Sequence, residues 1–132
     1  MGETEMAVLR EIYSYWEKGD FRPTHFLQPD FELVYGRDFV EEGAYKGREE
    51  VSAGWRVWLS GWKFWAASAA EYIPVGDRVL VFIDVHGVAK ASGVEMAQPS
   101  ANVWEFRDGL ASRITLYARR ETALRDLGLE SA

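Results

Sequence analysis

Residues 78–88 read RVLVFIDVHGV, and the alternation along this stretch predicts a β-strand. One face of the strand is wholly apolar, whereas the other carries an acid and an imidazole two residues apart, Asp84 and His86. A strand covered on both faces holds no ionisable group unless that group is paired or used. These two residues therefore either belong to an active site or lie where the strand leaves the core and meets water. The apolar face comprises Val79, Val81, Ile83 and Val85, and the mixed face comprises Leu80, Phe82, Asp84 and His86.

The composition indicates a single domain over residues 1–132 with a sizeable core, because 48% of the residues are hydrophobic. The net charge of −6 argues against nucleic acid and anionic membrane surfaces as partners, and no apolar run is long enough to span a membrane. The chain has no cysteine, which excludes disulfides and thiolate sites and suits a reducing compartment. We therefore expect a cytoplasmic protein.

The chain divides into a helical first part and a strand-rich second part. The joints Gly76-Asp77, Ser92-Gly93 and Asp108-Gly109 have turn chemistry, and they predict an antiparallel meander of the later strands. Segregated helices and strands indicate the α+β class, and a curved sheet with helices on its concave face would enclose a cone-shaped pocket. We expect helices at 4–19, 24–27 and 48–62, strands at 31–35, 64–75, 78–90, 93–106 and 110–119, a loop at 36–47 and a terminal helical turn at 121–127.

Local motifs fit this order of elements and extend over nearly the whole chain. They are WEKGDF (16–21), PDFELV (29–34), YKGREEV (45–51), GDRVLV (76–81), SGVE (92–95), VWEFRDG (103–109) and LYARRETALRDLGL (116–129). Together they resemble the SnoaL-like branch of the nuclear-transport-factor-2-like superfamily. The resemblance implies a cone-shaped fold in which N-terminal helices pack on a curved, mostly antiparallel sheet. It implies no particular activity, because this fold hosts cyclases, isomerases, dehydratases, epoxide hydrolases and non-catalytic binding domains.

The resemblance also places a pocket between the helices and the concave face of the sheet, with the even-numbered residues of the later strands pointing inward. The charged residues Glu95 and Glu105 have the opposite parity on strand 93–106, in agreement with this expectation. The polar residues among the inward set either hydrogen-bond a ligand or lie on an ordinary wet face. The inward set on this strand is Met96, Gln98, Ser100, Asn102, Trp104 and Phe106.

The sequence departs from two patterns of acidic residues within the superfamily. SnoaL-like cyclases present an inward Asp on the last strand, where Leu116 stands here. Ketosteroid-isomerase-like members carry acids at the positions that correspond to Tyr35 and Asn102. Since neither arrangement is reproduced, the resemblance does not extend to those specific activities.

The same parity points Asp84 and His86 into the cone. His86 would act as a general base that Asp84 orients or makes more basic, and Tyr35 or Tyr13 would donate a proton to an oxyanion that Asn102 hydrogen-bonds. This set suits dehydration, isomerisation or cyclisation of an apolar carbonyl compound without a cofactor. We predict Asp84, His86 and Tyr35 as catalytic residues, and Tyr13, Trp55, Trp58, Phe82, Gln98, Asn102 and Trp104 as ligand-binding residues.

The sequence gives no support for a metal or a nucleotide cofactor. His25 and His86 are the only histidines, no third ligand has metal-site spacing, and no glycine-rich nucleotide motif occurs. Trp55, Trp58 and Trp62 either fill the core or form the wall of a site for a neutral or cationic apolar molecule. The chain is accordingly either a cofactor-free enzyme or a non-catalytic domain for ligand binding or dimerisation.

The apolar face of strand 78–90 would point away from the proposed cone. Four β-branched side chains in a row should not face water. We therefore predict that a second copy covers this face and forms a homodimer through the sheet.

Overall fold

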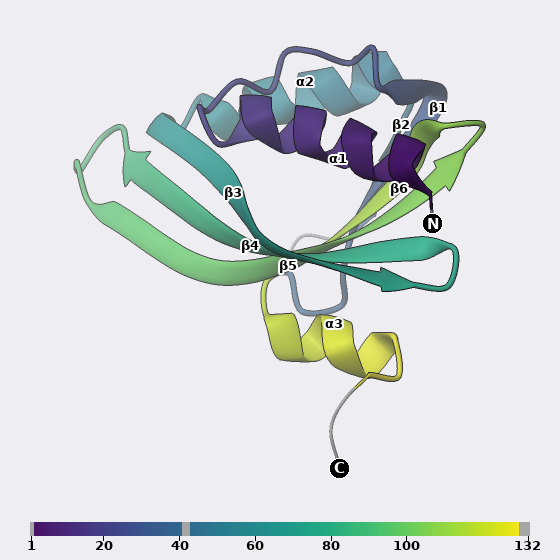
Figure 1. The fold of residues 1–132 in the computed structure, drawn as a ribbon. Coiled ribbons are helices and arrows are strands. Elements are labelled where there is room, and N and C mark those ends of the chain that lie inside the picture. Colours follow the sequence, from purple (N-terminus) through teal and green to yellow (C-terminus); the bar gives the residue numbers. More distant parts are fainter. Residues whose placement is uncertain (1, 41–42, 130–132) are drawn as a thin grey trace.

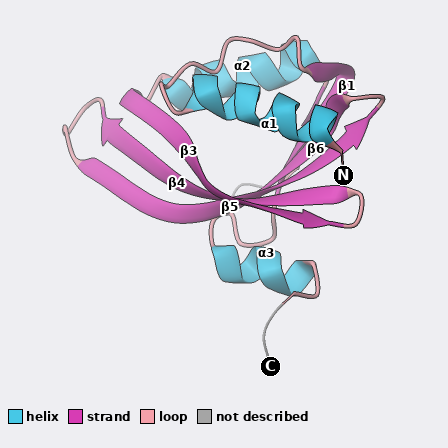
Figure 2. Ribbon diagram, in the orientation of Figure 1, coloured by secondary structure: helices cyan, strands magenta, loops and turns pink. Residues whose placement is uncertain are grey.

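The computed structural model describes residues 2–40 and 43–129, whose strands form one curved sheet (Figure 1). Helices α1 and α2 cover the concave face, and α3 lies on the opposite side (Figure 2). The strand order is β2-β1-β6-β5-β4-β3, in which β1 and β6 are parallel and the other neighbours are antiparallel. The α+β class and the cone of helices on a curved, mostly antiparallel sheet are thus confirmed. The elements are α1 (Glu3–Trp16), β1 (Leu27–Tyr35), β2 (Ala44–Lys46), α2 (Arg48–Leu59), β3 (Trp62–Val75), β4 (Arg78–Ala89), β5 (Glu95–Arg107), β6 (Leu110–Tyr117) and α3 (Arg120–Asp126).

Some element boundaries differ from the sequence prediction. The short helix predicted at 24–27 is wrong, because the backbone makes a single turn there and Leu27 already begins β1. The stretch predicted as a loop contains β2, which pairs with β1. Both differences arise from pairing between strands, which the local periodicity of one segment does not record. Within the described residues, no helix has the length and apolar character that a membrane span requires.

The orientation predicted for β4 is wrong. Val79 and Val81 lie in the main core with Leu9 of α1, so the wholly apolar face points toward the helices and not away from them. The register explains the reversal, because Val81 is opposite Asn102 and residues that pair directly share a face of the sheet. Odd-numbered residues of β4 therefore lie on the same face as even-numbered residues of β5. The inward parity predicted for β5 is correct from Met96 to Phe106, because the members of this set line the cavity, lie in the main core or pack against it.

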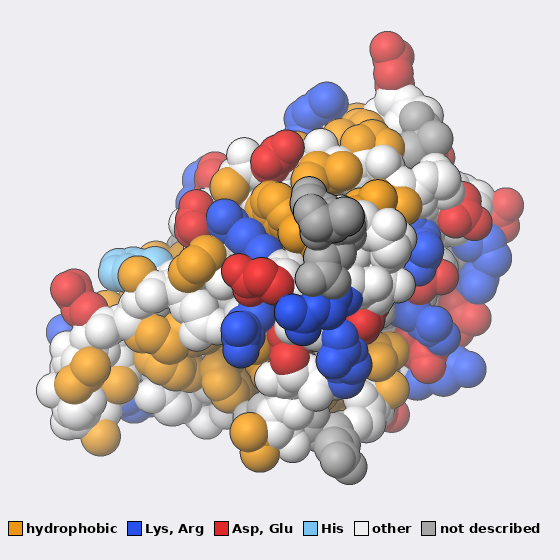
Figure 3. Space-filling model, turned by 90° about the horizontal axis from the view of Figure 1, so that it is seen from below, with side chains coloured by type: hydrophobic (Ala, Val, Ile, Leu, Met, Phe, Trp, Pro, Cys, Tyr) orange, Lys and Arg blue, Asp and Glu red, His pale blue; other side chains and the backbone are white. Residues whose placement is uncertain are grey.

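The convex face of the sheet has its own smaller core beneath α3. Leu80, Val103 and Tyr117 are buried there together with Ala123 of α3. Figure 3 shows this side of the molecule, where acidic and basic side chains are interspersed near its centre and apolar side chains extend over the strands. Both faces of β4 are thus partly covered by the chain itself, which explains why both faces are rich in apolar residues.

The homodimer was predicted because the apolar face of β4 was expected to face water, and this reason is wrong. Val79, Val81, Ile83 and Val85 are covered by the chain's own helices and by side chains around the cavity, so they need no second copy to shield them from water. A dimer through the sheet would have to use the convex face instead. The homodimer itself stays a prediction.

Candidate binding cavity

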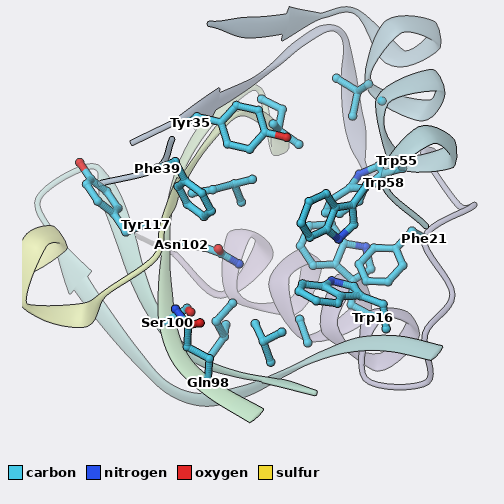
Figure 4. A pocket seen from close by; sticks show the side chains of 18 of the residues that line it. Trp16, Phe21, Tyr35, Phe39, Trp55, Trp58, Gln98, Ser100, Asn102 and Tyr117 are labelled. Atoms are coloured by element: carbon cyan, nitrogen blue, oxygen red, sulfur yellow. The ribbon is translucent and has the colours of Figure 1, made fainter. Parts of the chain in front are cut away.

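A cavity of about 220 Å³ lies between the concave face of the sheet and α2. Figure 4 shows its two contrasting walls. Trp55 and Trp58 project from α2 beside the rings of Trp16 and Phe21, whereas the polar side chains lie on the opposite side. The cavity combines an extensive apolar lining with a short polar strip, which is the usual make-up of a small-molecule site.

The aromatic wall is a set of rings in mutual contact. Trp55 packs against Phe21 with ring centroids 4.6 Å apart, and against Trp16 at 5.5 Å. Trp65 of β3 packs edge-on against Trp58 at 5.2 Å. Ring contacts of this kind add to the stabilisation from apolar burial and restrict the rotation of each side chain. The wall is therefore fixed before any ligand arrives.

A glycine on β4 makes room for part of this wall. A Cβ atom built at Gly87 would lie 2.8 Å from the ring of Trp65 and 3.0 Å from that of Trp62. Real Cβ atoms do not come so close to neighbouring carbon atoms, so the two indoles can lie across the strand only because residue 87 has no side chain. The glycine thus helps to set the position of the aromatic wall.

The polar strip comes from alternate residues of β5, as the period of a strand requires. Gln98 donates from Nε2 to the carbonyl of Ala118 at 2.7 Å, and Ser100 donates from Oγ to the same carbonyl at 3.0 Å. Asn102 lies next along the strand, with its side-chain amide 2.6 Å from the hydroxyl of Tyr13. All three side chains line the cavity.

Two of the predicted ligand-binding residues lie behind this strip. Trp104 is fully buried, and its Nε1 donates to the Tyr13 hydroxyl at 2.8 Å. Burial raises the pKa of Tyr13 well above its ordinary value, because the phenolate would lose its hydration. Tyr13 and Trp104 therefore support Asn102 from within the core, and neither is among the residues that line the cavity.

The predicted catalytic pair does not reach the cavity. Asp84 lies on the convex side and accepts a hydrogen bond from Arg120 of α3 at 3.2 Å. The guanidinium of Arg120 also lies over the ring of Phe82, 4.9 Å from its centroid. His86 is exposed beside Phe64. The expectation that Phe82, Asp84 and His86 point into the cone is wrong, because the register with β5 turns the even face of β4 away from the helices.

Tyr35 is the one predicted catalytic residue that lines the cavity. It lies on β1, across the cavity from the tryptophans of α2 (Figure 4). Of the predicted ligand-binding residues, Trp55, Trp58, Gln98 and Asn102 also line it. The structure thus brings together Tyr35, the two tryptophans of α2 and the polar strip.

Other residues of the cavity were not singled out from the sequence as ligand-binding. Tyr45 belongs to β2, which was predicted as a loop, and Phe39 lies in the same stretch. The inward position of Trp16 could have been predicted from the sequence, because it lies on the apolar face of α1 with Leu9 and Tyr13. The remaining aromatic residues in this group are Phe21, Trp65 and Tyr117. Trp62 also lines the cavity, in agreement with its interpretation as part of the wall of a site.

The chemistry available in the cavity is that of hydroxyls, amides and aromatic rings. Among the described residues that line it there is no Asp, Glu, His, Lys or Arg. Over residues 2–40 and 43–129, no three side chains of His, Cys, Asp or Glu gather into a group that would hold a metal ion. The arrangement can stack flat molecules and exchange hydrogen bonds with them.

The comparisons with known proteins agree with this architecture. The model of the SnoaL-like domain family matches residues 9–114. An NTF2-like protein of unknown function from Burkholderia pseudomallei is 22% identical and superimposes with a TM-score of 0.77, covering 99% of this chain and 100% of its own. TerC, co-crystallised with polyporic acid, is 20% identical with a TM-score of 0.76, covering 98% of this chain and 100% of its own.

A third similar structure is a candidate SnoaL-like polyketide cyclase from Jannaschia sp. CCS1, which is 14% identical with a TM-score of 0.75, covering 98% of this chain and 94% of its own. At these identities the structures show a shared fold and no shared activity. No curated protein sequence matches the chain significantly. Because the family model spans most of the sequence and the fold agrees with it, the chain belongs to the SnoaL-like domain family.

Proposed function

We propose that this protein binds a small, flat, uncharged molecule in the cavity between α2 and the concave face of the sheet. The observation that carries the proposal is the contrast between the two walls. Trp55, Trp58 and Trp65 offer ring faces and edges for stacking, and the polar strip of β5 offers neutral hydrogen-bonding groups. A charged ligand would lose its hydration without an opposite charge among the described lining residues, which is costly.

The size of the cavity narrows the class of ligand. Its volume of about 220 Å³ lies below the range of roughly 300–1,000 Å³ that is typical for drug-sized ligands. A bicyclic hydrocarbon or ketone is therefore a better probe than a polycyclic one. TerC, which shares the fold, was co-crystallised with a small molecule, polyporic acid, and this supports the use of the fold for ligand binding.

The proposal can be tested with two probes of similar size, tetralin and naphthalene-2-sulfonate, by titration of tryptophan emission. We expect tetralin to bind and the sulfonate not to bind, because only the latter carries a charge. Trp58→Ala should weaken tetralin binding by about 2- to 10-fold through the loss of one ring contact. His86→Ala is the matched control, since His86 lies on the other face of the sheet, and it should leave the affinity unchanged.

Two results would contradict this proposal. One is preferential binding of the sulfonate. The other is an equal loss of tetralin affinity in Trp58→Ala and His86→Ala, which would mean that the ligand does not occupy the cavity.

A catalytic role is the second candidate, and the position of Tyr35 favours it. Tyr35 lines the cavity, as does Asn102 on β5, so a phenol and an amide border the same space. A cofactor-free isomerase, dehydratase or cyclase would use Tyr35 to donate a proton to a carbonyl oxygen. The polyketide cyclase name of one similar structure belongs to the same range of chemistry.

Hydrogen exchange at the α-carbon of 2-tetralone in D₂O would reveal such proton transfer. We expect faster exchange with the protein than in buffer if the site is catalytic, and loss of the acceleration in Tyr35→Phe without loss of binding. Equal rates with and without the protein would leave ligand binding as the function. The cytoplasmic location also stays a prediction, which rests on the absence of cysteine.

A further inference from the structure

The direction of the hydrogen bond between Asn102 and Tyr13 decides which end of the Asn102 amide faces the cavity, and hence which ligands it can hydrogen-bond. The two atoms are 2.6 Å apart, between the side-chain amide and the hydroxyl oxygen. An N–H···O bond is usually about 2.7–3.2 Å long, whereas an O–H···O bond is usually about 2.5–3.0 Å. The distance alone is compatible with either direction, since Gln28 Nε2 donates to the carbonyl of Arg107 at 2.5 Å in the same structure.

The balance of donors and acceptors around Tyr13 decides the direction of this hydrogen bond. Trp104 Nε1 can only donate, and it already donates to the Tyr13 hydroxyl oxygen. If the Asn102 amide nitrogen also faced this oxygen, two donors would converge on it, and neither could accept the hydroxyl proton. If the amide oxygen faces it instead, each of the three groups has a partner of the right kind. The two ends of an amide have nearly the same shape, so the hydrogen-bond network decides between these orientations.

Tyr13 is able to donate in this way under ordinary conditions. Its hydroxyl is fully buried, and burial raises its pKa, so the group keeps its proton at neutral pH. The chain of bonds then runs from the Trp104 indole N–H to the Tyr13 oxygen, and from the Tyr13 O–H to the Asn102 Oδ1.

We infer that Asn102 presents its amide hydrogens to the cavity, turned over relative to the orientation drawn in Figure 4, and that the site selects ligands with an acceptor oxygen such as a carbonyl. Tyr13 and Trp104 are positioning residues for this donor. The inference rests on the proposed function, because it assigns a polar preference to the same cavity.

Asn102 has the most N–H groups available to the cavity within the polar strip, because the amide of Gln98 uses one of its two on Ala118. Gln98 and Ser100 both donate to the carbonyl of Ala118. A carbonyl cannot donate, so the amide of Gln98 is fixed with its nitrogen toward Ala118. The Ser100 hydroxyl likewise donates its only hydrogen to Ala118, so toward a ligand it can only accept a hydrogen bond. Of these three side chains, Asn102 is the one whose N–H groups are free of such a bond to Ala118.

The test compares two ligands with the same skeleton, 2-tetralone, which has one carbonyl, and tetralin, which has none. We expect the protein to bind 2-tetralone more tightly, and Asn102→Leu to reduce this preference by about tenfold with little change in tetralin affinity. The carbonyl stretch of bound ¹³C-labelled 2-tetralone should shift to lower wavenumber in the wild-type protein and not in Asn102→Leu. His86→Ala is the control, and it should retain both the preference and the shift.

A second measurement uses the wild-type protein, so it does not depend on whether a variant of the polar strip folds. In ¹⁵N-labelled wild-type protein, 2-tetralone should move the side-chain NH₂ resonances of Asn102, and tetralin should move them much less. In Tyr13→Phe, which removes the group that orients the amide, the carbonyl shift should shrink although the ligand still binds.

The outcomes separate the two claims. Binding of both ligands with equal affinity, no carbonyl shift and unmoved Asn102 resonances would overturn this inference and leave the proposed function in place. Failure of both ligands to bind would overturn the proposed function and this inference with it.

Discussion

The two faces of β4 (Arg78–Ala89) both begin with apolar residues, but they have different surroundings in the structure. On one face, Val79 and Val81 are buried against α1, and Ile83 and Val85 line the cavity. On the other face, Leu80 is buried under α3, but the strand then continues to exposed side chains at residues 84 and 86. The comparison teaches that a pair of ionisable residues on a largely apolar strand can mark the end of a small second core and not an active site.

The largest difference between the faces should appear as stability. Trp104 is paired with Val79 on the helix-facing side and is fully buried, so Trp104→Ala should lower the free energy of unfolding by about 3–5 kcal/mol. His86→Ala on the convex side should change it by less than about 0.5 kcal/mol, because His86 is exposed. Urea unfolding followed by circular dichroism measures both. Similar losses in the two variants would mean that the assignment of the faces is wrong.

A single added methyl group probes the cavity face more finely. In Gly87→Ala the new Cβ would lie 2.8 Å from the ring of Trp65, so the indoles must move. We expect a loss of about 1–3 kcal/mol from overpacking, together with a change in tryptophan emission. His86→Ala, one residue away on the opposite face, should leave the emission unchanged. Wild-type stability and emission in Gly87→Ala would show that Trp62 and Trp65 do not lie across this glycine.

Arg120 offers the corresponding probe of the convex face. Its guanidinium donates to the backbone carbonyls of Ile83 at 3.0 Å and Ser100 at 3.3 Å, besides its bond to Asp84. Arg120→Ala should cost about 1–2 kcal/mol, because it removes several hydrogen bonds that hold α3 on the sheet. Asp84→Asn should cost at most about 1 kcal/mol, since the Asp84 side chain of this ion pair is largely exposed.

Hydrogen exchange of the α3 amides, measured together with urea unfolding, would show where the effect of Arg120→Ala lies. If Asp84→Asn were as costly as Arg120→Ala, Asp84 would hold α3 on the sheet through more than this one contact.

The sequence was sufficient to predict the fold because the signals for it are local. The turns at Gly76, Gly93 and Gly109 all have positive φ, a conformation that glycine adopts readily, and they join consecutive antiparallel strands. The alternation of β4 also identified its two sets of residues correctly. What the alternation could not supply is which set faces the helices, because that depends on the register with a neighbouring strand.

The residues of the candidate site were predictable where the pattern of a single strand indicates the inward face. They were not predictable where the inward face depends on the register between two strands. Gln98 and Asn102 were placed correctly by the resemblance, and the charged neighbours of opposite parity on β5 agree with that placement. Asp84 and His86 were misplaced, because the pairing of Val81 with Asn102 joins an odd residue to an even one. Rings that come from separate elements, such as Tyr45, enter the cavity only through the tertiary fold.

The effect that is smallest at neutral pH and emerges only in alkali concerns Tyr117, which lines the cavity and also contacts α3. Its ring lines the cavity, and its hydroxyl donates to Asp126 of α3 at 2.9 Å. Burial, together with the hydrogen bond to Asp126, raises the pKa of Tyr117 to about 12, above the value near 10 of an unfolded chain. The folded protein thus holds this proton more tightly than the unfolded one. The resulting stabilisation is complete below about pH 10 and is lost as the pH rises through about 12.

Tyr117→Phe tests the direction of this pH dependence. The quantity to compare is the slope of the unfolding free energy against pH, because the substitution also removes the hydrogen bond to Asp126 and so changes the absolute stability. Between about pH 10 and 12 the free energy of unfolding should fall less steeply in Tyr117→Phe than in the wild-type protein. The pKa of Tyr13 is also raised by burial, but Tyr13 is present in both proteins and its contribution cancels in the comparison. Parallel curves would show that Tyr117 titrates alike in the folded and unfolded chains, and that its hydroxyl does not link the cavity to α3.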